Sequence, residues 1–292
     1  MPMRFWLCKV TRYAPVLIGK SGYASWGSFI LYQDQVYGFV SLCEDPHICR
    51  VSLFRSANLY TFNEVGEVLS DGLTAAPFIF DDKFYLIYVD RKRGNKARIA
   101  VSRDIEGPYK DFATVATPEL FGATEIDLGS NVYIRGPLVD VIVSNILPYP
   151  RNLWALRISV NGGFVNTWRI WQSPGLPGPW HSLHNASLYK LDDYYVLLSA
   201  SNDYTGSPYR GYIVGFYMDS LYNMDRAVKQ IVIDASAQSP ALLGRDAVLG
   251  ADTPSLVLAK DRAILYFSIV DRSVGRPWDI YAAEFVPCNY AH

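Results

Sequence analysis

The sequence predicts an all-β fold, a five-bladed β-propeller built from four-stranded antiparallel blades. Three observations favour it. A unit of apolar strand, polar turn and Tyr-rich strand recurs five times, at intervals of roughly 50 to 70 residues. No window carries a sustained helical apolar period between caps. The chain ends in an incomplete unit and begins with an unmatched strand, so the two ends can complete one another.

Each unit opens with a β-hairpin whose turn contains Asp or Gly, residues that tolerate turn dihedral angles. The hairpins cover residues 28–37, 77–85, 130–139, 187–195 and 255–264. Their turns are Gln33-Asp34, Asp81-Asp82, Arg135-Gly136, Asp192-Asp193 and Lys260-Asp261. A third strand follows at 49–54, 97–101, 153–158, 211–216 and 279–285, and the first four units continue into a fourth strand. Residues 1–292 are therefore predicted as one domain, with blades at about 23–70, 71–120, 121–173, 180–235 and 247–288.

The N-terminal strand 4–10 is expected to pair with 279–285 and to supply the outer strand of the last blade. This pairing would bring Cys8 towards Cys288. A disulfide there would clamp the ring. We expect free thiols at both positions instead, as in a reducing compartment.

Cys43 and Cys49 flank the loop between two predicted strands, and we expect free thiols there as well, with a disulfide as the alternative. The four cysteines have neither CxxC spacing nor nearby histidines in a zinc-ligand pattern. Structural zinc is therefore not expected.

Composition argues against several classes of function. The 292 residues include 27 basic and 28 acidic ones without a run of like charges, so nucleic acid is not an expected partner. No apolar run approaches the ~20 residues of a membrane-spanning helix, so no membrane span is expected. The first residues lack the apolar segment and cleavage site of a secretory signal, which favours a cytoplasmic location.

Two segments resemble a known superfamily. Residues 54–69 and 101–112 are similar to the S-x-D-l-x-x-F and S-x-D-x-x-G-P-[FY] blade segments of the five-bladed-propeller glycosidases. This superfamily comprises glycoside hydrolase family 43, its relatives in families 32, 62 and 68, and the mannoside phosphorylases of family 130. The segments are structural, because the Gly-Pro turns the chain and the Phe or Tyr packs between blades. The resemblance implies the propeller fold and a carbohydrate partner.

In a propeller the first strand of each blade lines the central channel, so two positions per blade converge on one face of the ring. One is the residue before the first strand, which gives Ser25, Thr74, Asp127, His184 and Asp252. The other is the loop after the second strand, which gives Glu44-Asp45, Asp90-Arg91, Asn145, Asn202-Asp203 and Asp271-Arg272. This face is therefore expected to be polar, with charges of both signs.

The resemblance implies an Asp base before the first strand of blade one, a second Asp that positions the substrate, and a Glu acid in a later blade. The sequence departs from this pattern. Ser25 stands where blade one should offer Asp, and His184 where blade four should offer Glu. The A-P-[DE] slot of blade two reads Ala76-Pro77-Phe78, so it has no acid either. Asp127 matches the family's I-D-P position, while Asp252 resembles a D-P-S start in a different blade.

Glycoside hydrolysis usually needs one protonated carboxyl and one ionised carboxylate, about 5 to 9.5 Å apart. Asp127 and Asp252 are the best candidate pair, because their blades lie two steps apart in a ring of five. The alternative is that both carboxylates cap strand ends or hold a water or cation in the channel. His184 is a candidate proton donor or sugar ligand, and otherwise a hydrogen-bonded polar residue.

The candidate substrate-binding residues are Trp26, Asp90, Arg91, Trp180, His181, Asp203, Asp271 and Trp278. Aromatic rings can stack on the C–H face of a sugar while acids and Arg bind its hydroxyls, and packing between blades is the competing role of each Trp. His181 and His184 are three residues apart, but no further Cys or His completes a metal site. No cofactor is expected, apart from a Ca²⁺ or other cation that the central channel can hold.

Three functions follow as hypotheses. The first is a glycoside hydrolase that uses Asp127 and Asp252 at the central funnel on an oligo- or polysaccharide. The second is a non-catalytic carbohydrate-binding propeller, motivated by the missing acids in blades one, two and four. The third is a protein-interaction scaffold that uses the outer loops.

Overall fold

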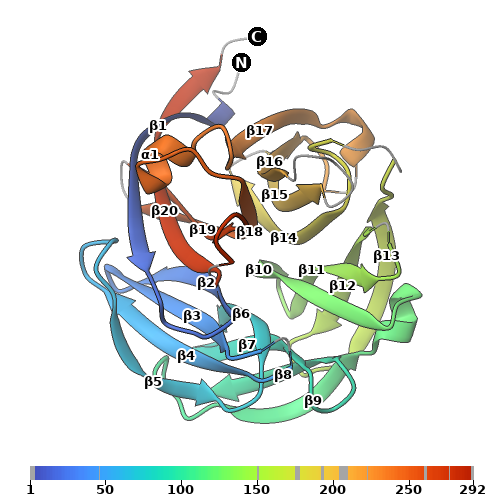
Figure 1. The fold of residues 1–292 in the computed structure, drawn as a ribbon. Coiled ribbons are helices and arrows are strands. Elements are labelled where there is room, and N and C mark those ends of the chain that lie inside the picture. The colour runs from blue at the N-terminus through green and yellow to red at the C-terminus, as the bar shows by residue number, and fades with distance from the viewer. Residues whose placement is uncertain are drawn as a thin grey trace.

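The computed structural model describes residues 4–45, 47–149, 151–174, 178–191, 194–203, 210–221, 223–259, 262–275 and 277–290. Five four-stranded antiparallel sheets stand around a central axis, so the predicted fold class is confirmed (Figure 1). Blade one contains β2 (Ala24–Tyr32), β3 (Gln35–Cys43), β4 (Cys49–Ser56) and β5 (Asn63–Leu69). Blade two contains β6 (Leu73–Phe80), β7 (Lys83–Asp90), β8 (Lys96–Ser102) and β9 (Lys110–Ala116). Blade three contains β10 (Glu125–Arg135), β11 (Leu138–Leu147), β12 (Leu153–Ser159) and β13 (Phe164–Trp171). Blade four contains β14 (Leu183–Leu191), β15 (Tyr194–Asp203), β16 (Arg210–Met218) and β17 (Val228–Asp234). Blade five contains β18 (Leu249–Ala259), β19 (Arg262–Asp271), β20 (Asp279–Tyr290) and β1 (Arg4–Leu17).

The first strand of every blade is innermost, and the other strands follow outwards in chain order, with β1 outermost in blade five. Neighbouring inner strands approach closely. A Cβ atom on Gly129 of β10 would lie 1.8 Å from the carbonyl oxygen of Ala186 on β14, so only glycine allows the two backbones to pack there. The inner strands β10 and β14 are therefore in close backbone contact beside the axis.

The hairpin turns of blades one and two have the left-handed backbone expected of their residues. The φ angles are 49° and 61° at Gln33 and Asp34, and 49° and 54° at Asp81 and Asp82. Two successive positive φ values fit the type I′ turn, whose twist matches that of the flanking strands. The predicted turns Asp192-Asp193 and Lys260-Asp261 lie outside the described residues.

The N-terminal strand closes the ring, as predicted, by pairing with β20 (Figure 1). The pairing is longer than expected, because β1 continues to Leu17. Leu7 and Leu17 are 1% and 2% exposed, so closure buries apolar side chains as well as a strand edge. The side chains of Cys8 and Cys288 lie outside the described part of the chain, and their thiol state stays a prediction.

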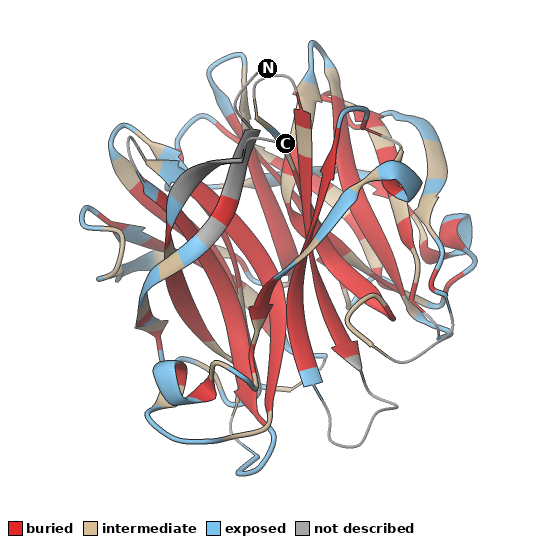
Figure 2. Ribbon diagram, turned by 90° about the horizontal axis from the view of Figure 1, so that it is seen from above, coloured by how far each residue is buried: buried red, intermediate tan, exposed pale blue. Residues whose placement is uncertain are grey.

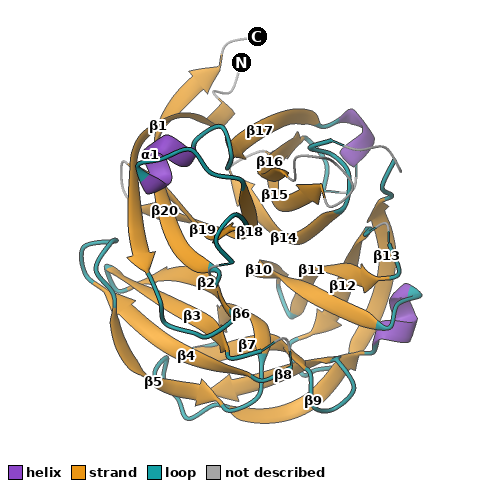
Figure 3. Ribbon diagram, viewed as in Figure 1, coloured by secondary structure: helices purple, strands orange, loops and turns teal. Residues whose placement is uncertain are grey.

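Buried residues run along the strands of every blade (Figure 2). The core consists of apolar faces packed between neighbouring sheets, with Phe39 and Tyr266 among the largest fully buried side chains. Among the described residues, helix is confined to α1 (Ser239–Leu243) and two short 3₁₀ turns, η1 (Pro118–Phe121) and η2 (Met224–Arg226) (Figure 3). No helix in the described ranges has the length and apolarity to span a membrane.

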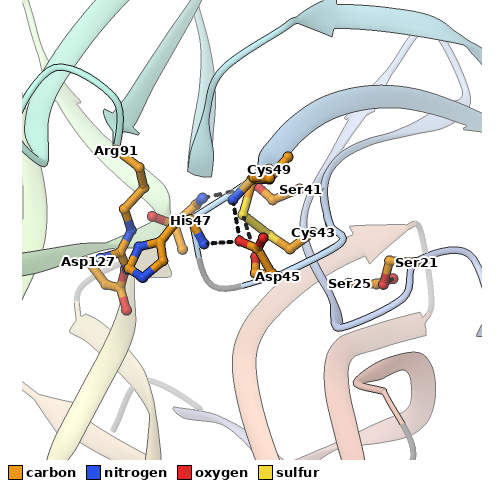
Figure 4. The surroundings of a disulfide bond; sticks show 11 residues. Ser21, Ser25, Ser41, Cys43, Asp45, His47, Cys49, Arg91 and Asp127 are labelled. Carbon is orange, nitrogen blue, oxygen red and sulfur yellow. Dashed lines mark hydrogen bonds and ion pairs between the residues drawn. A yellow bond between two sulfur atoms is a disulfide. The ribbon is translucent and has the colours of Figure 1, made fainter.

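Cys43 and Cys49 form a disulfide, so the expectation of free thiols at this pair is wrong (Figure 4). Cys43 ends β3 and Cys49 begins β4, and the ladder pairs them directly, with their Cα atoms 4.1 Å apart. The sequence places both at the ends of one loop, but only the strand register brings them face to face. Within the loop, Asp45 Oδ1 accepts hydrogen bonds from the backbone N–H groups of His47 and Ile48, at 2.7 and 2.8 Å.

Candidate functional site

A cavity of about 200 Å³ opens at the end of the axis where the inner strands begin, and all five blades line it. Its charged lining consists of Arg91, Glu125, Asp127, Arg151, Asp252 and Arg272. Its aromatic lining consists of Tyr23, Trp26 and Trp278, and the other side chains are Leu73, Thr74, Ile146 and Asn185. The polar face with charges of both signs is therefore present where the propeller geometry predicts it.

Asp127 is a mostly buried carboxyl group with few partners. It lies on β10 two residues after Glu125, so both side chains face the same side of the strand. The Asp127 side chain is 13% exposed, Arg91 Nη2 lies 3.6 Å from its Oδ1, and this oxygen accepts no hydrogen bond from a described residue. Burial raises the pKa of Asp127 to about 6, against the opposing charge of Arg91 and with a further rise from the Asp252 carboxylate. Asp127 is therefore protonated well above the usual range of an aspartic acid.

Asp252 has the opposite environment. Its Oδ1 accepts hydrogen bonds from Asn185 Nδ2 at 2.7 Å and from the backbone N–H of Thr253 at 2.8 Å. Burial by itself would raise the pKa of Asp252, but the neighbouring His184 imidazole and the hydrogen bond from Asn185 hold this pKa below the usual range. No described residue donates a hydrogen bond to Oδ2, so this oxygen remains available to water or a ligand.

His184 contacts Asp252 but is not part of the cavity lining. Its Nε2 lies 3.4 Å from Asp252 Oδ1 and 3.1 Å from Asn202 Nδ2, while Nδ1 donates to the carbonyl of Ser182 at 2.9 Å. The ring is fully buried and does not line the cavity. The geometry therefore makes His184 a positioning residue for Asp252 rather than a group that touches a ligand.

Two arginines border the carboxyl groups. Arg91 follows β7, and its Nη1 lies 2.9 Å from Glu125 Oε2 while the guanidinium points towards Asp127 (Figure 4). Arg151 Nη2 donates to the Tyr149 hydroxyl at 3.0 Å, and the guanidinium lies 5.2 Å from the centre of that ring. Each arginine is thus held by a neighbour, and positive charge is fixed close to Asp127.

An aromatic wall stands where the last blade meets the first. The backbone N–H of Trp278 donates to the carbonyl of Tyr23 at 3.1 Å, and that of Ser25 donates to the carbonyl of Trp278 at 2.9 Å. Tyr23 packs edge to face on Trp26, with ring centres 6.2 Å apart, and the Arg272 guanidinium lies 5.9 Å from the centre of Trp278. Ring faces beside carboxyl and guanidinium groups suit a ligand that is apolar on one face and polar at its edges, as a sugar is.

Several lining side chains contain a buried polar atom without a hydrogen-bond partner among the described residues. Four of these atoms are Trp26 Nε1, Arg91 Nε, Asp127 Oδ1 and Asn185 Oδ1. Such groups are uncommon in native proteins, so water or a ligand is expected to complete them. Two are donors and two are acceptors, a set that hydroxyl groups can satisfy because each hydroxyl both donates and accepts.

Two predicted acidic residues lie away from the cavity. Asp90 is buried in a separate groove, where its Oδ1 accepts a hydrogen bond from the backbone N–H of Arg93 at 3.0 Å. Asp271 pairs with Arg245 and accepts hydrogen bonds from the backbone and side chain of Ser273. Both carboxylates therefore stabilise loops in this structure.

The predicted substrate-binding residues Trp180 and His181, which precede blade four, do not line the cavity. Trp180 packs edge to face on Phe216, with ring centres 5.4 Å apart, in the core between sheets. His181 is buried, and its Nδ1 lies 3.4 Å from the Ser173 hydroxyl. The side chain of Asp203 lies outside the described residues.

Sequence reasoning missed Glu125, Arg151 and Asn185. Glu125 could have been found from the alternation that gives it the same face as Asp127, and Asn185 from its place after His184, but nothing local marks Arg151. The sequence predicted that Thr74 faces the channel but did not predict the β-bulge that follows Leu73. Because of this bulge, both Leu73 and Thr74 line the cavity.

Below the cavity, polar groups on the inner strands bind one another. The hydroxyls of Ser130 and Ser187 both donate to the carbonyl of Pro254, at 2.6 and 2.8 Å. Within the described ranges, no three His, Cys, Asp or Glu side chains gather as a metal site. The Ca²⁺ or other cation that the central channel can hold stays a prediction.

The fold is similar to that of solved five-bladed β-propeller glycosidases, so the resemblance expected from the sequence is confirmed at the level of the fold. An α-L-arabinofuranosidase from Clostridium thermocellum shares 15% identity and a TM-score of 0.63 over 90% of each chain. The catalytic domain of a family 62 α-L-arabinofuranosidase from Coprinopsis cinerea shares 12% identity and a TM-score of 0.69, over 94% of this chain and 97% of that one. A β-1,2-mannobiose phosphorylase from Listeria innocua shares 10% identity and a TM-score of 0.65 over 90% of each chain. No protein-family model and no curated protein sequence matches the chain.

Proposed function

We propose that this protein is a glycoside hydrolase that acts on an oligo- or polysaccharide with one sugar unit in the cavity. The observation that carries the proposal is a pair of carboxyl groups in one cavity whose pKa values move apart. The pKa of Asp127 rises to about 6, while that of Asp252 falls below its usual range. Divergent pKa values in one site distinguish a general acid from a base or nucleophile.

The two carboxyl groups take different roles. Protonated Asp127 donates its proton to the glycosidic oxygen, and the leaving sugar departs as an alcohol. Ionised Asp252, which lines the cavity, either removes a proton from the attacking water or attacks the anomeric carbon to form a glycosyl ester that water then hydrolyses. Arg91, with its Nη2 3.6 Å from Asp127 Oδ1, stabilises the carboxylate that remains after proton transfer.

The size and chemistry of the cavity support a single sugar ring as its occupant. Its volume of about 200 Å³ is below the ~300 to 1,000 Å³ of pockets for drug-sized ligands. The side chains of Tyr23, Trp26 and Trp278 offer apolar aromatic surface, and the donors and acceptors without partners can bind hydroxyl groups. Structural neighbours named as arabinofuranosidases and a mannobiose phosphorylase act on carbohydrate, which supports the same class here.

The test is sugar release from a broad panel of plant and microbial glycans. The wild type is compared with Asp127→Asn, Asp252→Asn and the control Asp90→Asn, which removes a buried carboxylate outside the cavity. Each cavity variant is expected to lose activity about 10²-fold or more, because it loses the acid or the base. The control should retain activity in proportion to its folded fraction. Absence of release by the wild type, or release unchanged in both cavity variants, would overturn the proposal.

A non-catalytic carbohydrate-binding propeller is the second candidate. It is favoured by Ser25 and His184, which stand where the glycosidase pattern has acids. This function requires that sugars bind without turnover and that Asp127→Asn and Asp252→Asn leave the affinity within about twofold. If no sugar binds at all, the interaction scaffold is the remaining hypothesis.

A further inference from the structure

A larger groove lies between blades two and three, at the end of the molecule opposite the polar cavity. β6 begins at the cavity and runs away from it, and the groove lies where β7 and β9 begin and β8 ends. Its volume is about 750 Å³, within the ~300 to 1,000 Å³ typical of small-molecule sites. The β12–β13 turn of blade three, at Val160 and Asn161, forms the facing wall.

The groove has apolar walls. Tyr85, Val101, Phe112 and Val160 line it, and Phe112 is 43% exposed. Tyr85 is held by stacking on Phe78, with ring centres 4.8 Å apart. An aromatic ring left partly open in a concave site offers contact area that an apolar ligand can cover.

The blade-three wall is fixed against blade two by a close approach. A Cβ atom on Gly162 would lie 2.7 Å from the Cβ of Ala113 and 2.9 Å from Phe112, at a φ of 80°. Only glycine fits this contact without strain. The groove is therefore formed by packed backbone on both sides rather than by loose loops.

Three cationic side chains line the groove, Lys83, Arg103 and Lys110. None of these three side chains makes a hydrogen bond or ion pair with a described residue. The one lining carboxylate, Asp104, accepts a hydrogen bond from the backbone N–H of Glu106 at 2.9 Å. Asp81 does not line the groove, but its negative charge acts on the lining residue Tyr85. Burial raises the pKa of Tyr85, and the charge of Asp81 raises it further. Cationic side chains still exceed anionic ones, so the groove complements an anion.

We propose that this groove binds a small amphiphilic anion, a ligand with an aromatic or aliphatic body and a single carboxylate, sulfonate or phosphate. The apolar body covers Phe112 and Val101, and the anionic group lies among Lys83, Arg103 and Lys110. Charge-assisted hydrogen bonds to ammonium and guanidinium groups are stronger than neutral ones, which sets the preference for an anion. The site is independent of the polar cavity, so its test does not depend on glycosidase activity.

Calorimetric titration of the wild-type protein with 1-naphthoate and with 1-naphthalenemethanol tests the charge preference without any variant. Naphthoate is expected to bind about tenfold more tightly than the neutral alcohol. The difference should shrink at high salt, because salt screens exposed charges. Equal affinities, or no binding of naphthoate at about 1 mM, would overturn the proposal.

Two matched pairs of variants place the ligand in the groove. Phe112→Ser is compared with Phe164→Ser, because the two rings are 43% and 49% exposed but only Phe112 lines the groove. Lys110→Gln is compared with Lys20→Gln, an exposed lysine outside the groove. The groove variants should weaken naphthoate binding about five- to tenfold and the controls less than twofold. Binding unchanged in both groove variants would show that the ligand lies elsewhere and would refute the site.

Discussion

Asp127 determines the pH dependence expected at the scale of single residues. Because its pKa is about 6, the fraction of protein with a protonated acid falls above that pH. We expect kcat/KM to fall about tenfold per unit of pH above 6, since kcat/KM reports the free enzyme. The low-pH limb should lie below the usual pKa of an aspartic acid, because the pKa of Asp252 is lowered. A pH–rate profile of the wild type checks this, and a rate that stays constant to pH 8 would contradict the assignment of the acid.

The same residue has a consequence for stability that needs no substrate. The pKa of Asp127 is raised from 3.8 to about 6, so the folded state binds this proton more tightly than the unfolded state. The stabilisation is present below pH 4 and is lost as the pH rises through 6. The unfolding free energy of the wild type relative to Asp127→Asn should therefore be about 1 kcal/mol larger at pH 5 than at pH 7.5. Urea unfolding of both proteins measures it, and the titration of carboxyl groups that do not interact with Asp127 cancels in the difference. A difference that grows with pH would reverse the sign and refute the raised pKa.

Asn185 tunes Asp252 through one hydrogen bond and a left-handed backbone. Its φ is 47° and its Nδ2 lies 2.7 Å from Asp252 Oδ1. Asn185→Gly removes the amide and tolerates this φ, so the low-pH limb should move up by about one unit with little loss of stability. Asn185→Ala should move the limb equally but lose about 1 kcal/mol more stability, because a Cβ atom strains this backbone. If the low-pH limb of the pH–rate profile lies at the same pH in the wild type and both variants, the amide does not act on Asp252.

At the scale of single elements, the β3–β4 hairpin is covalently joined beside the cavity. The Cys43–Cys49 disulfide restricts the unfolded chain, so the double variant Cys43→Ser, Cys49→Ser should unfold with about 2 kcal/mol less free energy. Alkylation and mass spectrometry without reductant should find both cysteines protected. Full alkylation of both would contradict the disulfide. Because disulfides persist mainly in oxidising compartments, the same measurement on protein from its own cells bears on the cytoplasmic location, which stays a prediction.

At the scale of the whole molecule, β1 turns an open row of blades into a ring. Removing residues 1–17 would expose the edge of β20 and the pockets of Leu7 and Leu17, which are worth about 1.5 to 3 kcal/mol each. We expect the shortened chain to lose cooperative thermal unfolding and to associate. A synthetic peptide of residues 4–17 should restore the transition, and a scrambled peptide should not. Cooperative unfolding without the peptide would show that ring closure is dispensable.

The sequence determined the fold because the information is local and repeated. Alternation of apolar residues, turn chemistry such as Gln33-Asp34, and the incomplete last unit are each readable within a few residues, and they predict the strands, the blade order and the closing strand. The same geometry predicts which end of the axis is polar and places Asp127 and Asp252 there. These are consequences of strand direction, which local sequence sets.

Tertiary structure decided the chemistry of the site, because it depends on distances between blades. Arg151 enters the cavity from a loop with no local signal, and the opposite pKa shifts of Asp127 and Asp252 arise from burial and from neighbours on other strands. His184 was placed correctly along the chain, yet packing put its ring behind Asp252. Cys43 and Cys49 needed the strand register before they could be paired. Periodicity sets where a strand runs, whereas burial, register and charge at a site are sums over residues far apart in the sequence.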